Sequence, residues 1–288
     1  MNGTRTMIHL VSFATPQFRH RQIILGLSGR LNRVVDTVTD WTPRKLQSAG
    51  FQEVIPEISL KERGAGFWSW KPFIIQKRLN EVPEGDVVLY CDVGRIYPFK
   101  LLDQSVEPFV NWMLSHGQEI MPGIEIPWDG PISQWTKRDA LVALDMDREE
   151  ILEATPIQAS FSIWRAGSKS RDFAAKWMGL CSQRKLISDD PSICKLGEHP
   201  GFQENRHDQA LLSLLCMKEG LRGVSLGQKR PPLDSRNPSE VSRMVFGGNR
   251  VRNSGRAFKF LVLPLEVMEQ KLRPPVVSLT ASTSAPRS

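Results

Sequence analysis

The chain has 288 residues, enough for a full α/β core, and its 40% apolar and 24% charged residues are ordinary for a globular protein. No apolar run approaches the ~20 residues of a membrane-spanning helix, and the first residues lack the apolar segment of a secretory signal. Four cysteines without C-x-x-C spacing indicate neither a zinc ribbon nor a dense disulfide framework, and they predict buried free thiols. We expect a cytoplasmic protein with one domain over 1–271 and a disordered tail over 272–288.

The net charge of +7 comes from the C-terminal part of the chain. Residues 218–273 hold 12 Lys/Arg and 5 Asp/Glu, a difference of 7 (12 − 5). Such a segment can bind diphosphates, anionic lipid headgroups or nucleic acid, or it can form a solvated basic surface. Within it, 227–256 is rich in Gly, Pro, Asn, Ser and Arg, and predicts a long mobile loop.

Hydrophobic periodicity and turn residues predict alternating strands and helices along the chain. In chain order they are a strand over 7–14, a helix over 17–31, a strand over 33–38, a helix over 73–80 with Pro72 in its first turn, a strand over 86–90, a helix over 105–115, a strand over 119–121, a helix over 135–144, a strand over 158–164, and helices over 168–181 and 208–219. The opening strand, helix and strand indicate a βαβ unit and a parallel sheet. The near-continuous apolar run 86–90 is typical of a central strand covered on both faces.

The sharpest local feature is the end of that central strand, where VVLY runs into Cys91, Asp92, Val93 and Gly94. Ligands of open α/β sheets bind beyond the carboxyl ends of the strands. A carboxylate there can hold a divalent cation or a ribose hydroxyl, and Gly94 permits close approach of the backbone. The alternative is that Asp92 merely caps the next turn.

A second feature is the segment RGAGFWSWKP at 63–72, which packs two glycines, three aromatics and two cations before a helix. Backbone N–H groups together with Arg63 and Lys71 suit a phosphate or diphosphate. Trp68 and Trp70 offer faces on which a base or sugar can stack, or they are core anchors. The spacing is neither that of a Walker A motif nor G-x-G-x-x-G.

A third feature is NRHDQA at 205–210, which opens a leucine-rich helix. Asp208 is a good N-cap by residue type, and capping is one interpretation of it. A His-Asp pair also occurs in metal phosphohydrolases, but the other scattered ligands that those enzymes require are not evident in this sequence.

Together these features resemble the GT-A glycosyltransferases, particularly bacterial enzymes of polysaccharide and lipopolysaccharide assembly. In that group a segment like GFWSWKPFIIQKRL precedes a strand like DVVLYCDVG, and stretches like QWTKRDAL, QASFSIWR and RHDQALLSLL follow in this order. The resemblance covers 7–220. It implies an α/β, Rossmann-like GT-A fold with a mostly parallel central sheet and one catalytic domain.

The resemblance also implies site residues. Asp92 matches the first Asp of the D-x-D element, which helps to hold the donor diphosphate through Mn²⁺ or Mg²⁺, and Gly94 stands where the second Asp would be. Asp208 and Gln209 look like the start of the D-Q-D segment of retaining galactosyl- and glucosyltransferases, with Ala210 in place of the final Asp. The expected catalytic residues are Asp208 and Gln209, and the expected donor-binding residues are Thr15, Arg63, Trp70, Lys71, Asp92, Gly94, Lys137, Arg138 and Asp139.

The implied reaction moves a hexose from a nucleotide-diphosphate sugar to a glycan or lipid-linked acceptor, with retention of configuration. The protein must then mainly offset charge on the departing diphosphate and orient the acceptor. The main alternative is a non-catalytic nucleotide-sugar or carbohydrate-binding domain on the same fold, favoured if Gly94 abolishes metal binding. A nucleic-acid-binding protein is a third hypothesis, disfavoured because no reading motif is present and the aromatics are not interleaved with the basic residues. The basic C-terminal part also allows peripheral contact with a membrane.

Overall fold

The computed structural model describes residues 5–94 and 100–228, which lie in one compact unit. The predicted loop over 227–256, apart from its first two residues, and the predicted tail over 272–288 lie outside the described residues. In the part of the chain that is described, no helix is both long enough and apolar enough to cross a bilayer. All four cysteines are free, as predicted.

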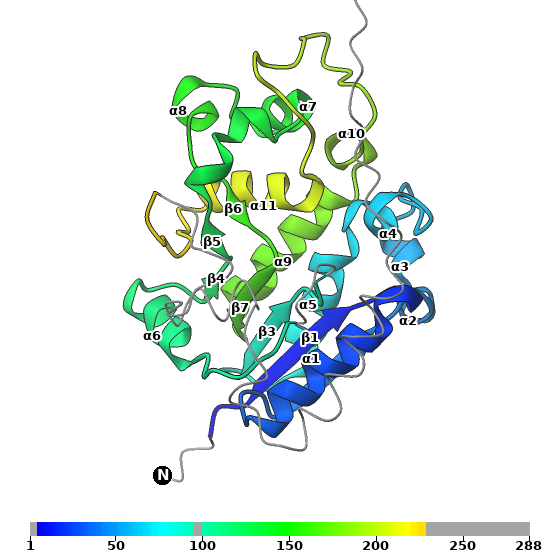
Figure 1. The fold of residues 1–288 in the computed structure, drawn as a ribbon. Helices are drawn as coiled ribbons and strands as arrows, with labels where there is room; N and C mark the ends of the chain where they lie inside the picture. Colours follow the sequence, from blue (N-terminus) through cyan, green and yellow to red (C-terminus); the bar gives the residue numbers. More distant parts are fainter. Residues whose placement is uncertain (1–4, 95–99, 229–288) are drawn as a thin grey trace, which may run out of the picture. The chain divides into compact units, whose positions relative to one another are not determined.

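The core of the fold is a five-stranded sheet in the order β2-β1-β3-β7-β4 (Figure 1). Its strands are β1 (Ile8–Phe13), β2 (Thr37–Trp41), β3 (Val87–Cys91), β4 (Ile120–Met121) and β7 (Phe161–Arg165). β1 pairs in parallel with β2 and β3, whereas β7 runs antiparallel to both of its neighbours. Four of the five strands therefore point the same way, and the predicted α/β fold with a mostly parallel central sheet is confirmed. A small second sheet pairs β5 (Ile124–Glu125) with β6 (Ile157–Gln158).

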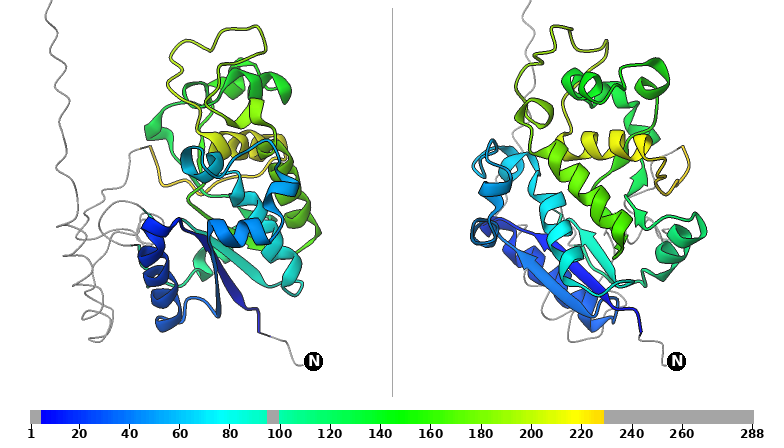
Figure 2. Two further views of the ribbon diagram at one scale, coloured as in Figure 1. Left: turned by 90° about the vertical axis from the view of Figure 1, so that its right-hand side faces the viewer. Right: turned by 180° about the vertical axis from the view of Figure 1, so that it is seen from behind.

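Helices cover both faces of the sheet (Figure 2). The helical segments are η1 (Pro16–Phe18), α1 (Arg19–Leu31), α2 (Pro43–Ser48), α3 (Phe51–Val54), α4 (Arg63–Phe67), α5 (Trp70–Glu81), α6 (Glu107–Ser115), η2 (Pro127–Asp129), η3 (Ile132–Gln134), α7 (Arg138–Ala143), α8 (Glu149–Leu152), α9 (Ser168–Cys181), α10 (Arg184–Ile187) and α11 (His207–Lys218). Apolar residues of α1 and α6 form one core with the sheet, and those of α5, α9 and α11 form the other.

Strand β3 shows why its sequence is almost wholly apolar. Val88 and Tyr90 point into the core with α5 and α9, while Val87, Leu89 and Cys91 point into the core with α1 and α6. Side chains alternate across a strand, so a strand covered on both faces needs apolar residues at every position. Full burial of each aliphatic side chain contributes roughly 1.5–3 kcal/mol. The prediction of a central strand here is confirmed.

The second predicted strand is misplaced. The β-branched run at 33–38 overlaps β2 by only two residues, because Val34 and Val35 belong to the turn that ends α1. Their N–H groups donate to Gly29 O at 2.8 and 3.2 Å, and Arg33 has a positive φ of 55°. Burial of the two valines in the core, rather than strand pairing, accounts for their residue type.

Two further predicted elements differ in their bounds from the structure, and two helices were missed. The predicted helix over 135–144 is shortened to α7, and the predicted strand over 158–164 is divided between β6 and β7, which belong to different sheets. The helices α2 and α3 were not predicted at all. A signal for α2 was present, since the Thr42 hydroxyl caps its first turn by accepting from Lys45 N at 3.3 Å and Pro43 opens it.

Candidate functional site

The site begins at the end of the central strand, where Asp92 follows Cys91, the last residue of β3. Tyr90 and Asp92 lie two positions apart and therefore on the same side of the strand. The Tyr90 hydroxyl donates to Asp92 Oδ1, and Asp92 N donates to Ser160 O at 2.9 Å. Burial, with the Asp92 carboxylate adding to it, raises the pKa of Tyr90 well above its usual value, so the phenol stays a proton donor. Gly94 has a φ of 69°, which few other residues adopt.

Lys71, in the first turn of α5, reaches the same place from the neighbouring helix. Its side chain is almost fully buried, and its ammonium lies 2.7 Å from Asp208 Oδ2 and 3.0 Å from Ala159 O. The ammonium also lies 5.4 Å from the centre of the Tyr90 ring. Burial opposes the positive charge, but the carboxylates of Asp208 and Asp92 outweigh it and raise the pKa of Lys71. Lys71 is therefore a fixed positive charge inside the protein.

Asp208 lies in the first turn of α11 and not at the capping position, which Arg206 occupies. The Asp208 carboxylate is turned into the protein, where the residue is 4% exposed. Burial raises the pKa of Asp208 to about 6, against the opposing effect of Lys71 and with a further increase from Asp92. Trp177 holds the backbone here by donating its indole N–H to Asp208 O at 3.0 Å. At neutral pH this buried carboxylate is ionised, but it lies close to its titration range.

Several polar atoms near these groups have no hydrogen-bond partner among the described residues. They include Thr15 Oγ1, Gln158 Oε1 and Gln209 Nε2, all shielded from solvent. Because β1 and β3 are parallel and Val11 pairs with Tyr90, Thr15 and Asp92 leave the sheet at the same edge. An unsatisfied buried polar group costs about 1–3 kcal/mol, so a ligand or ordered water that bonds to these atoms would be stabilising.

The glycine-rich segment before α5 forms an unusual left-handed turn. Five consecutive residues, Gly64 to Trp68, have φ values of 63°, 56°, 94°, 53° and 57°. For L-residues this conformation costs roughly 1–2 kcal/mol each, and it persists only when the surroundings hold it. Trp70 supplies part of that hold by donating its indole N–H to Gly64 O at 3.0 Å. The turn brings Phe67 and Trp68 against the His207 ring, each with centroids 5.3 Å from it.

Two predicted donor-binding residues have their functional groups occupied by the protein. The Arg63 guanidinium lies 2.9 Å from Glu204 and 3.6 Å from Asp189. Asp189 also lies 2.8 Å from His207 Nε2, and burial lowers the pKa of that imidazole. A diphosphate would have to compete with these carboxylates for Arg63. Trp70 is buried and stacks on Phe13 with 4.0 Å between ring centroids, so neighbouring side chains cover its faces.

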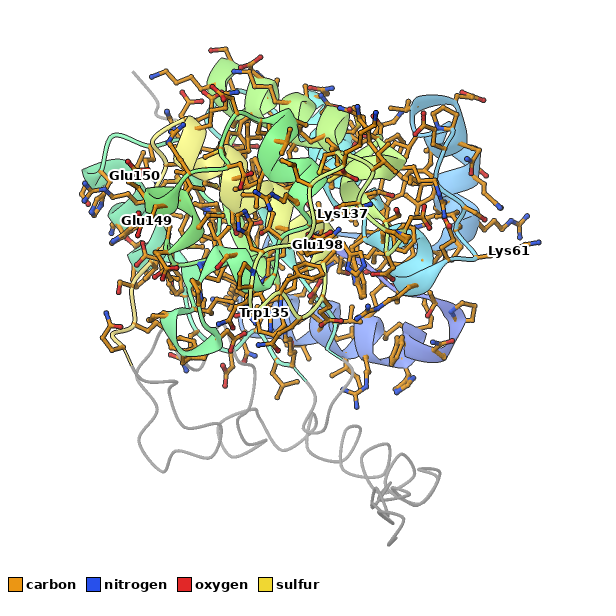
Figure 3. The ribbon with its side chains drawn as sticks, turned by 90° about the horizontal axis from the view of Figure 1, so that it is seen from above. Lys61, Trp135, Lys137, Glu149, Glu150 and Glu198 are labelled. Carbon is orange, nitrogen blue, oxygen red and sulfur yellow. The ribbon has the colours of Figure 1, made fainter. Side chains whose placement is uncertain are left out.

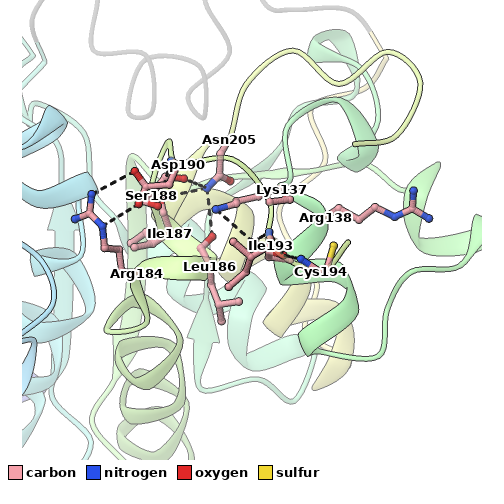
Figure 4. A network of polar contacts seen from close by, with 12 residues as sticks. Lys137, Arg138, Arg184, Leu186, Ile187, Ser188, Asp190, Ile193, Cys194 and Asn205 are labelled. Atoms are coloured by element: carbon pink, nitrogen blue, oxygen red, sulfur yellow. Dashed lines mark hydrogen bonds and ion pairs between the residues drawn. The ribbon is translucent and has the colours of Figure 1, made fainter. Parts of the chain in front are cut away.

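The predicted Lys137-Arg138-Asp139 group lies at α7, apart from the strand ends. Asp139 accepts the backbone N–H groups of Ile193 and Cys194, both labelled in Figure 4, at 2.8–3.0 Å. Arg138 donates to Gly197 O at 2.8 Å, which ties down the same stretch. Arg138 and Asp139 thus fasten the loop over 188–205, which we call the α10–α11 loop. Lys137 is different, because among the described residues its buried ammonium has a 3.4 Å ion pair with Asp139 and no hydrogen bond.

Sequence reasoning missed several residues that the fold brings to this region. Tyr90 carried a usable signal, since it lies two positions before Asp92 in a strand whose sides alternate. Asp189 and Glu204 carried none, because they lie in a loop without periodicity, and Asn205 was noted only as the first residue of the NRHDQA segment. Their relevance follows only from their contacts with Arg63, His207 and α10.

Within 5–94 and 100–228, no three His, Cys, Asp or Glu side chains come together as they would around a resident metal ion. Of the two carboxylates at the strand end, Asp208 is held by Lys71, and Asp92 accepts from Tyr90 through one oxygen. The protein therefore offers a cation one accessible carboxylate at most, and substrate oxygens would have to supply the remaining ligands. Mg²⁺ commonly binds in this way, with one or two carboxylates and substrate phosphates.

No family model and no curated protein matches the chain. Among solved structures, mouse xyloside xylosyltransferase 1 in its apo form is 9% identical with a TM-score of 0.41, over 75% of this chain and 84% of that one. The galactosyltransferase LgtC, in complex with donor and acceptor sugar analogues, is 11% identical with a TM-score of 0.36, over 72% and 70%. The glycosyltransferase GlyE of Streptococcus pneumoniae is 12% identical with a TM-score of 0.32, over 78% and 46%.

Proposed function

We propose that this protein is a glycosyltransferase that moves a hexose from a nucleotide-diphosphate sugar to a glycan or lipid-linked hydroxyl acceptor in polysaccharide biosynthesis. The observation that carries the proposal is the meeting of Asp92, Lys71 and Asp208 at the carboxyl end of the central strand. These residues come from separate parts of the chain, and the sequence resemblance had singled out each of them. A buried ion pair at that edge of an α/β sheet supports a ligand site there.

The charges of this site suit the departure of a diphosphate from a sugar. The positive end of the α11 dipole favours an anion, and the Lys71 ammonium adds a fixed positive charge behind it. The Asp208 carboxylate can stabilise positive charge that develops on the sugar ring, while Gln209 and Thr15 offer polar atoms to sugar hydroxyls. Lys71 acts by orienting Asp208 and keeping it ionised, so we assign it a positioning role. We propose retention of configuration because Asp208-Gln209 resembles the start of the D-Q-D segment of retaining enzymes.

We further propose that Mn²⁺ or Mg²⁺ enters with the donor diphosphate and that Asp92 is its single protein carboxylate. When bound there, the cation would neutralise charge on the leaving diphosphate. Because the second position of the D-x-D element is Gly94, this contribution depends on ligands from the substrate. A thermal-shift screen of nucleotide sugars with and without Mn²⁺, on the native protein and on Asp92→Asn, tests the assignment. Equal stabilisation of both proteins by donor with metal would contradict it.

The decisive experiment compares Asp208→Asn with Asp172→Asn, an exposed carboxylate of α9 that serves as matched control. Release of UDP or GDP from a panel of nucleotide sugars is measured with and without neutral glycan acceptors. Under conditions where circular dichroism shows both variants to be folded, we expect Asp208→Asn to reduce transfer by roughly a hundredfold, the scale of losing one well-placed electrostatic contact, while Asp172→Asn is unchanged. Full transfer activity in Asp208→Asn ends the catalytic assignment.

The same assay separates the enzyme from a non-catalytic binding module on this fold. A binding module would be stabilised by a nucleotide sugar but would release no nucleoside diphosphate with any acceptor.

We also propose that the protein is cytoplasmic and contacts a membrane through its basic segment over 218–273, most of which lies outside the described residues. Flotation with anionic and with neutral vesicles tests this, and equal recovery with both would contradict it.

A further inference from the structure

A cavity of about 480 Å³ lies between α7 and the α10–α11 loop. Its lining includes Lys137 from the start of α7 and Asp189, Glu198, Phe202 and Asn205 from the loop. A volume of this size falls within the range of small-molecule sites, about 300–1,000 Å³. Figure 3 looks down on this part of the molecule and labels Lys137 and Glu198, which both line the cavity.

Two buried polar atoms at this cavity lack hydrogen-bond partners among the described residues. They are the Lys137 ammonium, which has a 3.4 Å ion pair with Asp139 but no hydrogen bond, and Asn205 Oδ1, on residues that are 2% and 4% exposed. Figure 4 shows the two side chains pointing toward one another. Burying such atoms without a partner is unfavourable, and a ligand that accepts from Lys137 and donates to Asn205 would satisfy both.

The cavity is preformed, because its walls are fastened by hydrogen bonds that involve no ligand. Asn205 Nδ2 donates to the carbonyls of Leu186, Ile187 and Ser188 at 3.1–3.2 Å, which orients Oδ1. Asp139 holds the N–H groups of Ile193 and Cys194, which lie in the loop between the lining residues Ser192 and Leu196. A preformed cavity loses little conformational entropy when it is occupied.

The charges at the cavity select for an uncharged, hydroxyl-rich ligand. The lining holds one cation, Lys137, and four carboxylates on Asp189, Asp190, Glu198 and Glu204. A phosphate would be repelled by these carboxylates, and a metal ion would be repelled by the Lys137 ammonium. Sugar hydroxyls can donate to carboxylates and to Asn205 Oδ1 and accept from Lys137. Phe202, together with Pro191 and Leu196, provides apolar surface for the C–H face of a sugar ring.

The cavity adjoins the proposed reaction site without being part of it. Asn205 precedes Asp208 by three positions, and Asp189 contacts His207, the first residue of α11. Within the proposed function, on which this inference rests, we propose that the cavity binds a neutral sugar unit of the acceptor glycan. The α10–α11 loop then selects the acceptor, and the strand ends hold the donor.

The test measures binding of neutral glycosides in the absence of any nucleotide, so its outcome does not depend on transfer activity. Saturation-transfer NMR is recorded with methyl glucoside, methyl galactoside, methyl mannoside and lactose, and with methyl glucuronide as the anionic counterpart. The variants are Lys137→Met and Glu204→Gln, with Lys61→Met as the matched control at an exposed lysine. Glu204→Gln lies at the half-exposed rim and keeps the proposal testable if Lys137→Met fails to fold.

We expect at least one neutral glycoside to bind, the glucuronide to bind more weakly, and Lys137→Met to weaken binding by roughly tenfold or more, as for loss of a charge-assisted hydrogen bond. Glu204→Gln should weaken binding to a smaller extent, and Lys61→Met should leave it unchanged. The proposal is overturned if no neutral glycoside binds. It is also overturned if Lys137→Met and Glu204→Gln bind the glycoside as tightly as the native protein does.

Addition of a nucleotide sugar then shows whether the cavity takes a sugar unit of the acceptor glycan or the hexose of the donor. If the cavity takes the acceptor, glycoside binding persists when a nucleotide sugar is added. If intact nucleotide sugars displace the glycoside but nucleoside diphosphates do not, the cavity takes the donor hexose, and the acceptor assignment is wrong. Glycoside binding without any binding of nucleotide sugars would overturn the proposed transfer while leaving the sugar-binding cavity in place.

Discussion

The Lys71 ammonium and Asp208 Oδ2 lie 2.7 Å apart in a place where both residues are almost fully buried. This ion pair links α5 to the first turn of α11 and lies beside the end of the central strand. Each charge is acceptable in the interior only because the other is there, since an isolated buried charge is strongly destabilising. Variants at one of the two positions therefore change the fold as well as the site.

Lys71→Met should lower the free energy of unfolding by about 3–5 kcal/mol, because it leaves the Asp208 carboxylate buried without its cation. The double variant Lys71→Met/Asp208→Asn should recover part of that loss, since no unpaired charge remains. Urea unfolding followed by circular dichroism measures both, with Lys61→Met expected within ~0.5 kcal/mol of the native protein. Additive effects of the two single changes would argue against the ion pair.

The raised pKa of Asp208 predicts a pH dependence that Asp208→Asn lacks. Its pKa in the folded protein is about 6, above the ~3.9 of an unperturbed Asp. Between these values the folded protein binds a proton that the unfolded chain does not, so this group makes folding more favourable as the pH falls. Relative to Asp208→Asn, the native protein should gain roughly 1.4 kcal/mol per pH unit from about pH 6 to pH 4 and nothing above pH 7.

Urea unfolding of both proteins at pH 7, 6, 5 and 4.5 checks this difference, because other titrating groups are common to the two. Parallel stability curves would show that Asp208 titrates normally. If ionised Asp208 is required for transfer, kcat/KM of the native protein should also fall below pH 6.

Gly64→Ala should disrupt the left-handed turn through a contact with Trp68. A Cβ at Gly64 would lie 2.4–2.6 Å from the Trp68 ring, closer than any real contact. Gly117→Ala is a matched control, since its φ of 65° is close to the 63° of Gly64 but a Cβ there meets nothing within 4 Å. Both variants bear the cost of a positive φ, so the difference between their unfolding free energies isolates the clash. Gly64→Ala should be less stable than Gly117→Ala by at least ~1 kcal/mol and should shift the NMR signals of the His207 ring. Equal stabilities of the two variants would contradict the described conformation of the turn.

Asp139→Asn should loosen the α10–α11 loop while leaving α7 in place. Burial opposes ionisation of Asp139, but the N–H groups of Ile193 and Cys194 outweigh it and lower its pKa, so these hydrogen bonds favour the carboxylate. An amide side chain accepts them less strongly. Hydrogen exchange at Ile193 and Cys194 should accelerate by roughly tenfold, as expected for ~1.4 kcal/mol of lost local stability. Unchanged exchange, with Asp172→Asn as control, would show that Asp139 does not fasten the loop.

Much of the fold could be predicted because local chemistry decides it. The apolar run of β3 predicts a strand covered on both faces, and the helix over 168–181 was predicted with its observed bounds. The prediction of a strand over 33–38 was wrong for a non-local reason, since Val34 and Val35 are buried by α1 and the sheet without pairing as a strand. β-Branched residues suit a buried turn as well as a strand, and residue type alone does not separate the two.

For the site, the sequence by itself determined which polar side chains end strands and begin helices: Asp92, Lys71 and Asp208 were all identified from it. Only the tertiary structure decided their states, because burial and the distances between charges set the pKa of Asp208 and pair it with Lys71. It also decided that Arg63 is neutralised by carboxylates and that Lys137 is left without a hydrogen-bond partner beside a cavity. These properties depend on contacts between residues distant along the chain, and no local pattern encodes such contacts.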